Sequence, residues 1–267
     1  MLRAFYGIEK NPFSLDNITL LPHQQEVFNI LKVHSHQGGF CLIMDEPGTG
    51  KTIIKKAIIQ EKEKSTIVVH IGRTLHTYTN TIKILCQAFN TDDFGSSFKC
   101  EKRLIQEAYT LKQSGKNLIV IIDDAHLMDI ATLRKLRLLF EDFPKNHNLI
   151  LMGETSLIQN ISLSINQDIK SRITFSEFLK KVNPDDMETF IIKELDNAGL
   201  GHNIFAEDAL SLIIRSSDGI LRKVRNLCLA SMIEAVRTGT KVIETKHVNS
   251  ILIQPHYRIE KEVEMIT

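Results

Sequence analysis

Short runs of apolar, largely β-branched residues recur along the first part of the chain. They are nearly continuous rather than alternating, which is typical of strands in a parallel sheet covered on both faces. Segments with apolar residues at helical spacing lie between them. This order predicts an α/β fold, a doubly wound three-layer αβα arrangement around a parallel sheet. The runs are Gly39–Met44, Thr66–Ile71, Leu118–Ile122 and Leu149–Met152, and the pattern permits a fifth short strand at Arg172–Phe175. The expected helices between them are Thr52–Lys62, Thr77–Phe89, Lys102–Ser114 and Ile130–Phe140.

The pattern changes after Lys181, where the chain becomes helical throughout. The sequence NPDD at 183–186 predicts a helix start, because Pro184 suits the first turn and acidic residues favour the positive end of the helix. We therefore expect an α/β domain followed by a small helical domain and a flexible tail. Their predicted bounds are 1–181, with 1–38 as an N-terminal segment, then 182–254 and 255–267. The helices expected in the second domain are 184–198, 206–217, 219–238 and 245–253.

The stretch MDEPGTGKT, residues 44–52, lies between a predicted strand and a predicted helix. It fits the phosphate-binding loop G-x-x-x-x-G-K-[ST] of P-loop NTPases except at its first position, where Asp45 replaces glycine. In such a loop the backbone and the helix N-terminus hold phosphates. Lys51 would reach the β- and γ-phosphates, and the Thr52 hydroxyl would hold Mg²⁺. We interpret Asp45 as a hinge between strand and loop. We expect the site to work but to be slow. The predicted nucleotide-binding residues here are Pro47, Gly48, Thr49, Gly50, Lys51 and Thr52.

Acidic residues end two of the later strands. In LIVIIDDAH, residues 118–126, Asp123 is expected to hold Mg²⁺, and Asp124 stands where a catalytic glutamate usually polarises the attacking water. Aspartate can do this work with a reach one methylene shorter. In LILMGET, residues 149–155, Glu154 is the first candidate for positioning water and Thr155 the second. We expect this strand to lie beside the strand of the phosphate loop.

Composition and charge exclude some classes of protein. The net charge of +1 over 267 residues favours no particular partner. No apolar run approaches the ~18–20 residues of a membrane helix, and charged residues interrupt the N-terminus, so we expect a cytoplasmic protein without a membrane partner. The four cysteines lack metal spacing and are expected to be reduced packing residues. His34 and His36 are expected in a loop, and no histidine has metal-ligand spacing.

Several segments resemble the AAA+ ATPases, and among them the ExeA-like ATPases of secretion and transposition. FYGIEKNPFS at 5–14 resembles the N-terminal segment of that family, LRLLFEDF at 136–143 the stretch after the acidic strand end, and DGILRKVRNLCLASMIEA at 218–235 its lid signature. The resemblance implies ATP and Mg²⁺ as ligands, with the N-terminal segment and 21–31 near the adenine.

The resemblance also implies roles for two arginines. Arg222 matches the lid arginine that contacts the γ-phosphate. Arg172 matches the first arginine of a Gln-Arg-Ile-x-x-Arg segment, whose second arginine is replaced here by Ser176. It is the candidate arginine finger acting on the nucleotide of a neighbouring subunit, which implies self-assembly into a ring or spiral. An ordinary surface arginine is the alternative.

The resemblance leaves more than one function open. We expect an accessory ATPase of DNA transposition, which assembles on double-stranded DNA and recruits or regulates a transposase. The alternative is an ATPase that assembles a secretion complex. Secretion relatives continue into a membrane helix and a wall-binding domain, whereas this chain ends at Thr267. A third alternative is a nucleotide-dependent binding switch with little hydrolysis, in view of Asp45, Asp124 and Glu154.

Basic residues that could contact DNA phosphates form two groups. Arg134, Lys135 and Arg137 share one predicted helix, and Lys223 and Arg225 lie in the lid signature. For each group a solvated helical face is the favoured alternative.

Overall fold

The computed structural model describes residues 1–14, 18–61, 64–72 and 77–255. Its contacts divide the chain into two compact units. One unit is Leu20–Lys180, and the other combines Met1–Thr19 with Lys181–Thr267.

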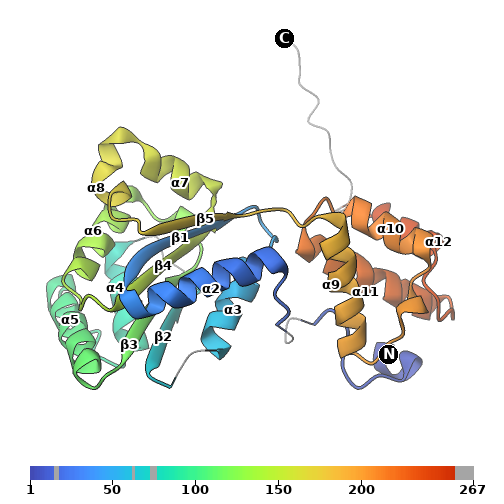
Figure 1. The fold of residues 1–267 in the computed structure, drawn as a ribbon, viewed down its shortest axis with the longest axis horizontal. Coiled ribbons are helices and arrows are strands. Elements are labelled where there is room, and N and C mark those ends of the chain that lie inside the picture. Colours follow the sequence, from blue (N-terminus) through green and yellow to red (C-terminus); the bar gives the residue numbers. More distant parts are fainter. Residues whose placement is uncertain (15–17, 62–63, 73–76, 256–267) are drawn as a thin grey trace, which may run out of the picture. The chain divides into compact units, whose positions relative to one another are not determined.

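The unit Leu20–Lys180 contains a parallel five-stranded sheet, which confirms the predicted fold class (Figure 1). The strand order is β2-β3-β4-β1-β5, so β1 lies between β4 and β5. The fifth strand lies further along the chain than the sequence predicts. Thr174 donates its hydroxyl to the Phe40 carbonyl at 3.1 Å, and strand pairing begins only at Phe175. The strands are β1 Gly39–Asp45, β2 Thr66–Ile71, β3 Asn117–Ile122, β4 His147–Glu154 and β5 Phe175–Leu179.

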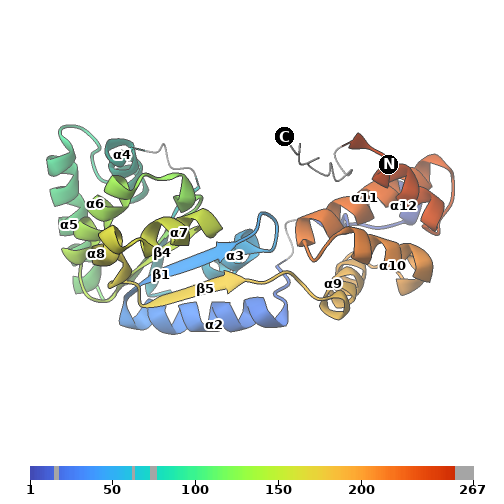
Figure 2. The same ribbon diagram turned by 90° about the horizontal axis from the view of Figure 1, so that it is seen from above.

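Helices cover both faces of this sheet (Figure 2). On one face α2 and α3 pack against strand residues such as Ile119 and Ile150. On the other face α4 to α8 enclose a larger core that includes Leu42, Val120 and Leu151. Both faces of each strand are therefore apolar, which explains the continuous apolar runs. The helices are α2 Pro22–Gln37, α3 Lys51–Gln60, α4 Tyr78–Ala88, α5 Ser97–Gln113, α6 Ile130–Glu141, α7 Thr155–Ser162 and α8 Gln167–Lys170, with 3-10 turns η1 Ala125–Leu127 and η2 Ser164–Asn166.

Helix α2 corrects one expectation. His34 and His36 lie in its last turns and not in a loop. The helix begins with Pro22, and the Gln24 side chain accepts a hydrogen bond from the backbone N–H of Leu21 at 3.1 Å. A proline at the first position and a glutamine at the third are helix start signals, which the sequence analysis did not use.

The second unit is helical, as the sequence predicts for its C-terminal part. Asn183 caps α9 by accepting from the Asp186 N–H at 2.8 Å, with Pro184 in the first turn. Its elements are α1 Leu2–Tyr6, α9 Pro184–Asn197, η3 His202–Ile204, α10 Glu207–Ser216, α11 Leu221–Arg237 and α12 Thr245–Leu252. Of the predicted tail 255–267, all but Pro255 lies outside the described residues.

Residues 1–19 belong to this helical unit, whereas the sequence analysis assigned them to the α/β domain. Helix α1 contacts α11, and the side chains of Ile8 and Phe13 are buried. Burial of these apolar side chains joins the two ends of the chain in one core.

The cysteines agree with a packing role. Cys41, Cys86, Cys100 and Cys228 are free and buried, and burial raises the pKa of the Cys41 and Cys86 thiols to about 11. Among the residues that the structure describes, no helix is long and apolar enough to cross a membrane.

Candidate nucleotide-binding site

The loop between β1 and α3 has the geometry of a phosphate cradle. Gly48 and Gly50 have φ of 100° and 132°, a region of backbone conformation that side chains with a Cβ rarely adopt. Gly50 precedes the first residue of α3, so the backbone N–H groups at the start of that helix face the loop. A helix N-terminus directed into a glycine-containing loop favours bound phosphate. The predicted position of this loop between a strand and a helix is confirmed, and its contact with a nucleotide stays a prediction.

Lys51 is held by two groups at the edge of the sheet. Its ammonium forms an ion pair with the carboxylate of Asp45 and donates to the Gly153 carbonyl at 3.1 Å. The other carboxylate oxygen of Asp45 accepts from the Thr49 hydroxyl at 2.8 Å. Asp45 is 1% exposed and pairs as the last residue of β1 with Glu154 and Leu179. It is therefore a buried, paired charge at the point where β1 passes into the loop.

Asp123 and Asp124 follow β3 at the same edge. Oδ2 of Asp123 lies 2.6 Å from Nζ of Lys55, one turn after Lys51 on α3. Asp124 has a φ of 52°, unusual for a residue with a side chain, and its N–H donates to Oδ1 of Asp123 at 3.0 Å. Sequence reasoning missed Lys55, although its spacing of four residues from Lys51 places both on one helix face.

Glu154 ends β4, directly beside the end of β1. Its Oε1 lies 3.7 Å from Nε2 of His126, which lies in η1 two residues after Asp124. A side chain at Gly153 would approach the backbone N of His126 to 3.1 Å, so this glycine lets the two segments come close. Thr155, the second candidate, is the first residue of α7. His126 is a further polar neighbour of the site that the sequence analysis did not single out.

Together these groups fit a magnesium nucleotide. The carboxyl ends of β1, β3 and β4 meet at one edge of the sheet, where ligands bind in open α/β folds. Lys51 and the loop backbone supply positive potential for phosphates. The Thr52 hydroxyl and the Asp123 carboxylate supply the oxygen ligands that Mg²⁺ prefers.

Comparison with known proteins agrees with this geometry. Residues 33–161 match the family model described as AAA domain. These residues are therefore similar to an AAA domain. All the loop and strand-end residues named above lie within the matched range, whereas Arg172 and Arg222 lie beyond it.

The chain resembles a curated protein over most of the chain's own length. It is 26% identical over 253 residues to General secretion pathway protein A of Aeromonas hydrophila, covering 91% of this chain and 46% of that protein. The chain thus spans about half the length of this relative. The predicted resemblance to ExeA-like AAA+ proteins is confirmed.

Solved structures confirm the AAA+ fold. The Aeropyrum pernix ORC2 protein has a TM-score of 0.72 at 15% identity, covering 93% of this chain and 74% of that one. Cdc6p of Pyrobaculum aerophilum has a TM-score of 0.70 at 18% identity, covering 86% and 67%. The Thermotoga maritima RuvB Holliday junction branch migration motor has a TM-score of 0.59 at 18% identity, covering 90% and 71%.

Arg172 lies at the opposite edge of the sheet from the AAA domain's phosphate loop. It precedes β5 and lines a pocket with Gly39 and His147, which begin β1 and β4. Its side chain is 60% exposed, and its Nε lies 2.9 Å from Oε1 of Glu141. Since β1 has seven residues, about 20 Å of sheet separates this edge from the loop. Arg172 therefore does not reach the nucleotide site of its own AAA domain.

Arg222 is exposed in the first turn of α11, in the helical unit. Its contact with a nucleotide stays a prediction.

The basic residues of α6 in the AAA domain have partners within the chain. Arg134 donates to Asp168 at 2.8 Å, and Arg137 donates to Glu141 at 2.8 Å. The ammonium of Lys135 lies 5.3 Å from the centre of the Tyr78 ring. These contacts favour the structural alternative over a DNA-binding role.

Arg225 is not a surface residue. It is 6% exposed, its NH2 lies 3.7 Å from Oε1 of the buried Glu194, and its guanidinium lies 5.1 Å from the centre of the Phe190 ring. Burial lowers the pKa of Arg225 and raises that of Glu194, and the charge of each opposes the shift of the other. Arg225 therefore fits neither the possible DNA contact nor the favoured solvated face, because this side chain lies inside the helical unit.

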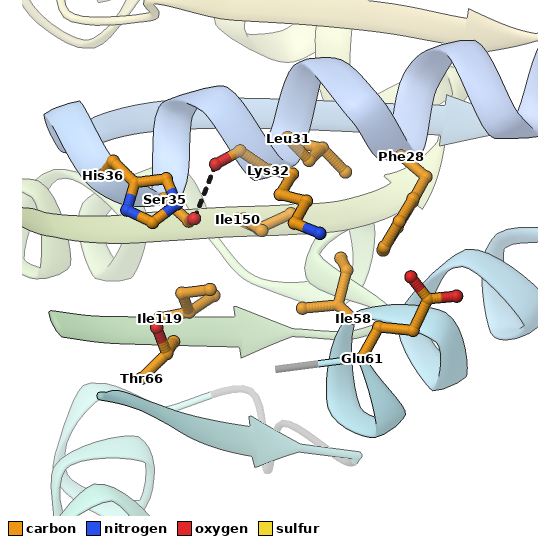
Figure 3. A pocket seen from close by; sticks show the side chains of 10 residues that line it. All are labelled: Phe28, Leu31, Lys32, Ser35, His36, Ile58, Glu61, Thr66, Ile119 and Ile150. Carbon is orange, nitrogen blue, oxygen red and sulfur yellow. Dashed lines mark hydrogen bonds between the residues drawn. The ribbon is translucent and has the colours of Figure 1, made fainter. Parts of the chain in front are cut away.

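A separate pocket lies between α2, α3 and the sheet of the AAA domain (Figure 3). Phe28, Leu31 and Ile58 line it together with Ile119 and Ile150 of the sheet. Its volume of about 30 Å³ suits one or two water molecules and is far too small for a nucleotide.

Replacing Arg225 by alanine should destabilise the protein, because a buried Glu194 loses its cation. Breaking such a pair costs about 3–5 kcal/mol, measurable as the free energy of unfolding in urea. Lys223→Ala, on the same helix, is the control and should change stability by less than about 0.5 kcal/mol. Unchanged stability of Arg225→Ala would contradict the buried pair.

Proposed function

We propose that this protein is a magnesium-dependent ATPase that works as an assembly of identical subunits. The observation that carries the proposal is the meeting, at one sheet edge, of the phosphate loop with Lys51 and the acidic end of β3. Lys51 and the loop backbone would bind the β- and γ-phosphates, and Thr52 and Asp123 would hold the metal ion. Bound Mg²⁺ would neutralise phosphate charge and favour attack by water.

Two carboxylates are candidates for orienting that water. Asp124 follows the metal ligand directly, and its positive φ holds it at the turn out of β3. Glu154 lies at the end of the adjacent strand beside His126. We propose Asp124 for this role, because it occupies the position of the usual catalytic acid, and Glu154 as the polar residue that positions the γ-phosphate or the water.

A neighbouring subunit in the assembly would supply an additional positive charge, that of Arg172, to the nucleotide site. Arg172 is exposed at the edge of the sheet opposite its own loop, so it can act only on the nucleotide of another subunit. Positive charge delivered there would stabilise the charge of the transferring phosphoryl group. This role is that of an arginine finger, with Arg222 as the lid arginine of the same site.

For the biological role we propose an accessory ATPase of DNA transposition that assembles on double-stranded DNA and engages a transposase. Its support is the resemblance of residues 5–14 and 218–235 to the ExeA-like ATPases of secretion and transposition, a resemblance that the secretion alternative shares. The secretion alternative is supported by the similarity to General secretion pathway protein A. The binding switch with little hydrolysis is favoured by one observation, that Lys51 and Asp123 are both paired within the chain.

Lys51→Ala should abolish ATP binding, because the phosphates lose their principal cation. Asp124→Asn should bind ATP as the wild type does and hydrolyse it at least about 100-fold more slowly, since general-base catalysis contributes that much. Binding of a fluorescent ATP analogue and phosphate release measure the two effects. Lys112→Ala, an exposed lysine on α5, is the control. Binding by Lys51→Ala at wild-type affinity would refute the site, and loss of turnover in Glu154→Gln but not in Asp124→Asn would transfer the role to Glu154.

Arg172→Ala should bind ATP normally but lose turnover by about 1,000-fold, the effect of removing an arginine finger. Mixing it with Lys51→Ala subunits should restore phosphate release, because those subunits carry Arg172 for their neighbours. Glu141→Gln breaks the same ion pair while keeping Arg172, and should retain activity. Failure of the mixed subunits to recover would contradict action between subunits.

The proposed DNA role predicts binding to double-stranded DNA that requires ATP. A gel-shift with a non-hydrolysable ATP analogue should show a complex that weakens as salt rises, because phosphate contacts release counterions. Lys51→Ala should form no such complex. Absence of DNA binding by the wild type at low salt would favour the secretion alternative.

A further inference from the structure

The lysine that would bind the phosphates, Lys51, is already paired with a carboxylate of the chain. Asp45 stands where the phosphate-loop pattern has glycine, and its side chain forms an ion pair with Lys51. The pair is enclosed, since the side chains of Asp45 and Lys51 are 1% and 12% exposed. Glycine at this position has no side chain to pair with the lysine, so the ion pair exists because this chain has Asp45 there.

The surroundings keep Asp45 in place. Its backbone is part of β1 and pairs on both sides, with Glu154 and Leu179. Its second oxygen accepts from Thr49, whose carbonyl in turn accepts from the Gln24 side chain at 3.0 Å. A strand residue with this burial and these partners does not turn toward solvent to make room for a ligand.

Bound phosphates and Asp45 therefore compete for one ammonium group. If Lys51 moves to the phosphates, Asp45 keeps the Thr49 hydroxyl but loses its cation, and a buried carboxylate without a cation is costly. If Lys51 stays, the phosphates lie beside a buried negative charge with their lysine already neutralised. Both arrangements oppose binding.

We propose that Asp45 is an internal competitor for Lys51 that sets a weak affinity of this site for nucleotides. The inference rests on the proposed function, because it concerns the same loop. It assigns Asp45 to the control of affinity for the phosphate chain, where a glycine would leave Lys51 to the ligand. Nucleotide would then bind only at high concentration and dissociate rapidly, and this applies to ATP and ADP alike because both carry the β-phosphate.

The test is Asp45→Asn, which removes the charge but keeps the size and an acceptor for Thr49. We expect the dissociation constants of Mg-ATP and Mg-ADP, measured by calorimetry, to fall at least about 10-fold, which is about 1.4 kcal/mol. Dissociation of a fluorescent nucleotide should become slower in the same variant. The control is Glu46→Gln, which removes an exposed carboxylate from the adjacent position and should change affinity by less than about 3-fold because solvent screens it.

Asp45→Gly, which restores the usual loop residue, is the second variant in case the asparagine disturbs the fold, and it should also bind more tightly. Unchanged binding by variants whose unfolding curves match the wild type would overturn the inference, since Asp45 would then not compete for Lys51. Weaker binding would overturn it as well, since Asp45 would then orient Lys51 toward the phosphates. Binding absent from the wild type and from both variants would instead refute the nucleotide site itself. The two failures are thus distinguishable.

Discussion

The parallel pairing of β1 with β4 and β5 determines where the polar groups of the site lie. In this register Asp45 stands opposite Glu154, and the phosphate loop leaves the sheet at the same edge as the acidic end of β3. Sheet pairing leaves these strand ends little freedom. Buried apolar side chains on both faces hold the register, so the site depends on the core behind it.

Both lysines at this edge are paired with carboxylates of the chain. Two lysines on successive turns of α3 meet two carboxylates, Lys51 with Asp45 and Lys55 with Asp123. Each pair joins a residue expected to bind nucleotide or metal to a partner of opposite charge. A ligand that binds here exchanges protein ion pairs for its own contacts, so affinity is a difference between two sets of charge interactions.

The two units carry different candidate residues. The α/β unit carries the loop and the strand-end acids, and at its opposite edge Arg172 is exposed. The helical unit carries Arg222 on its surface, while the neighbouring Arg225 is buried against Glu194 and Phe190. These two arginines, three residues apart, thus differ in exposure because Arg225 lies on the buried side of α11 and Arg222 does not.

Local sequence determined much of the secondary structure of this protein. Continuous apolar runs determined four strands, and the proline and acids at 184–186 determined the start of α9. The glycines, lysine and threonine of the loop indicated phosphate binding, because their chemistry is local. Only the tertiary structure decided that Asp45 is buried against Lys51, that Lys55 holds Asp123, and that residues 1–19 pack with the C-terminal helices. These contacts join elements distant in the sequence or depend on which face of an element is buried, and a pattern of residues read along one chain does not contain that information.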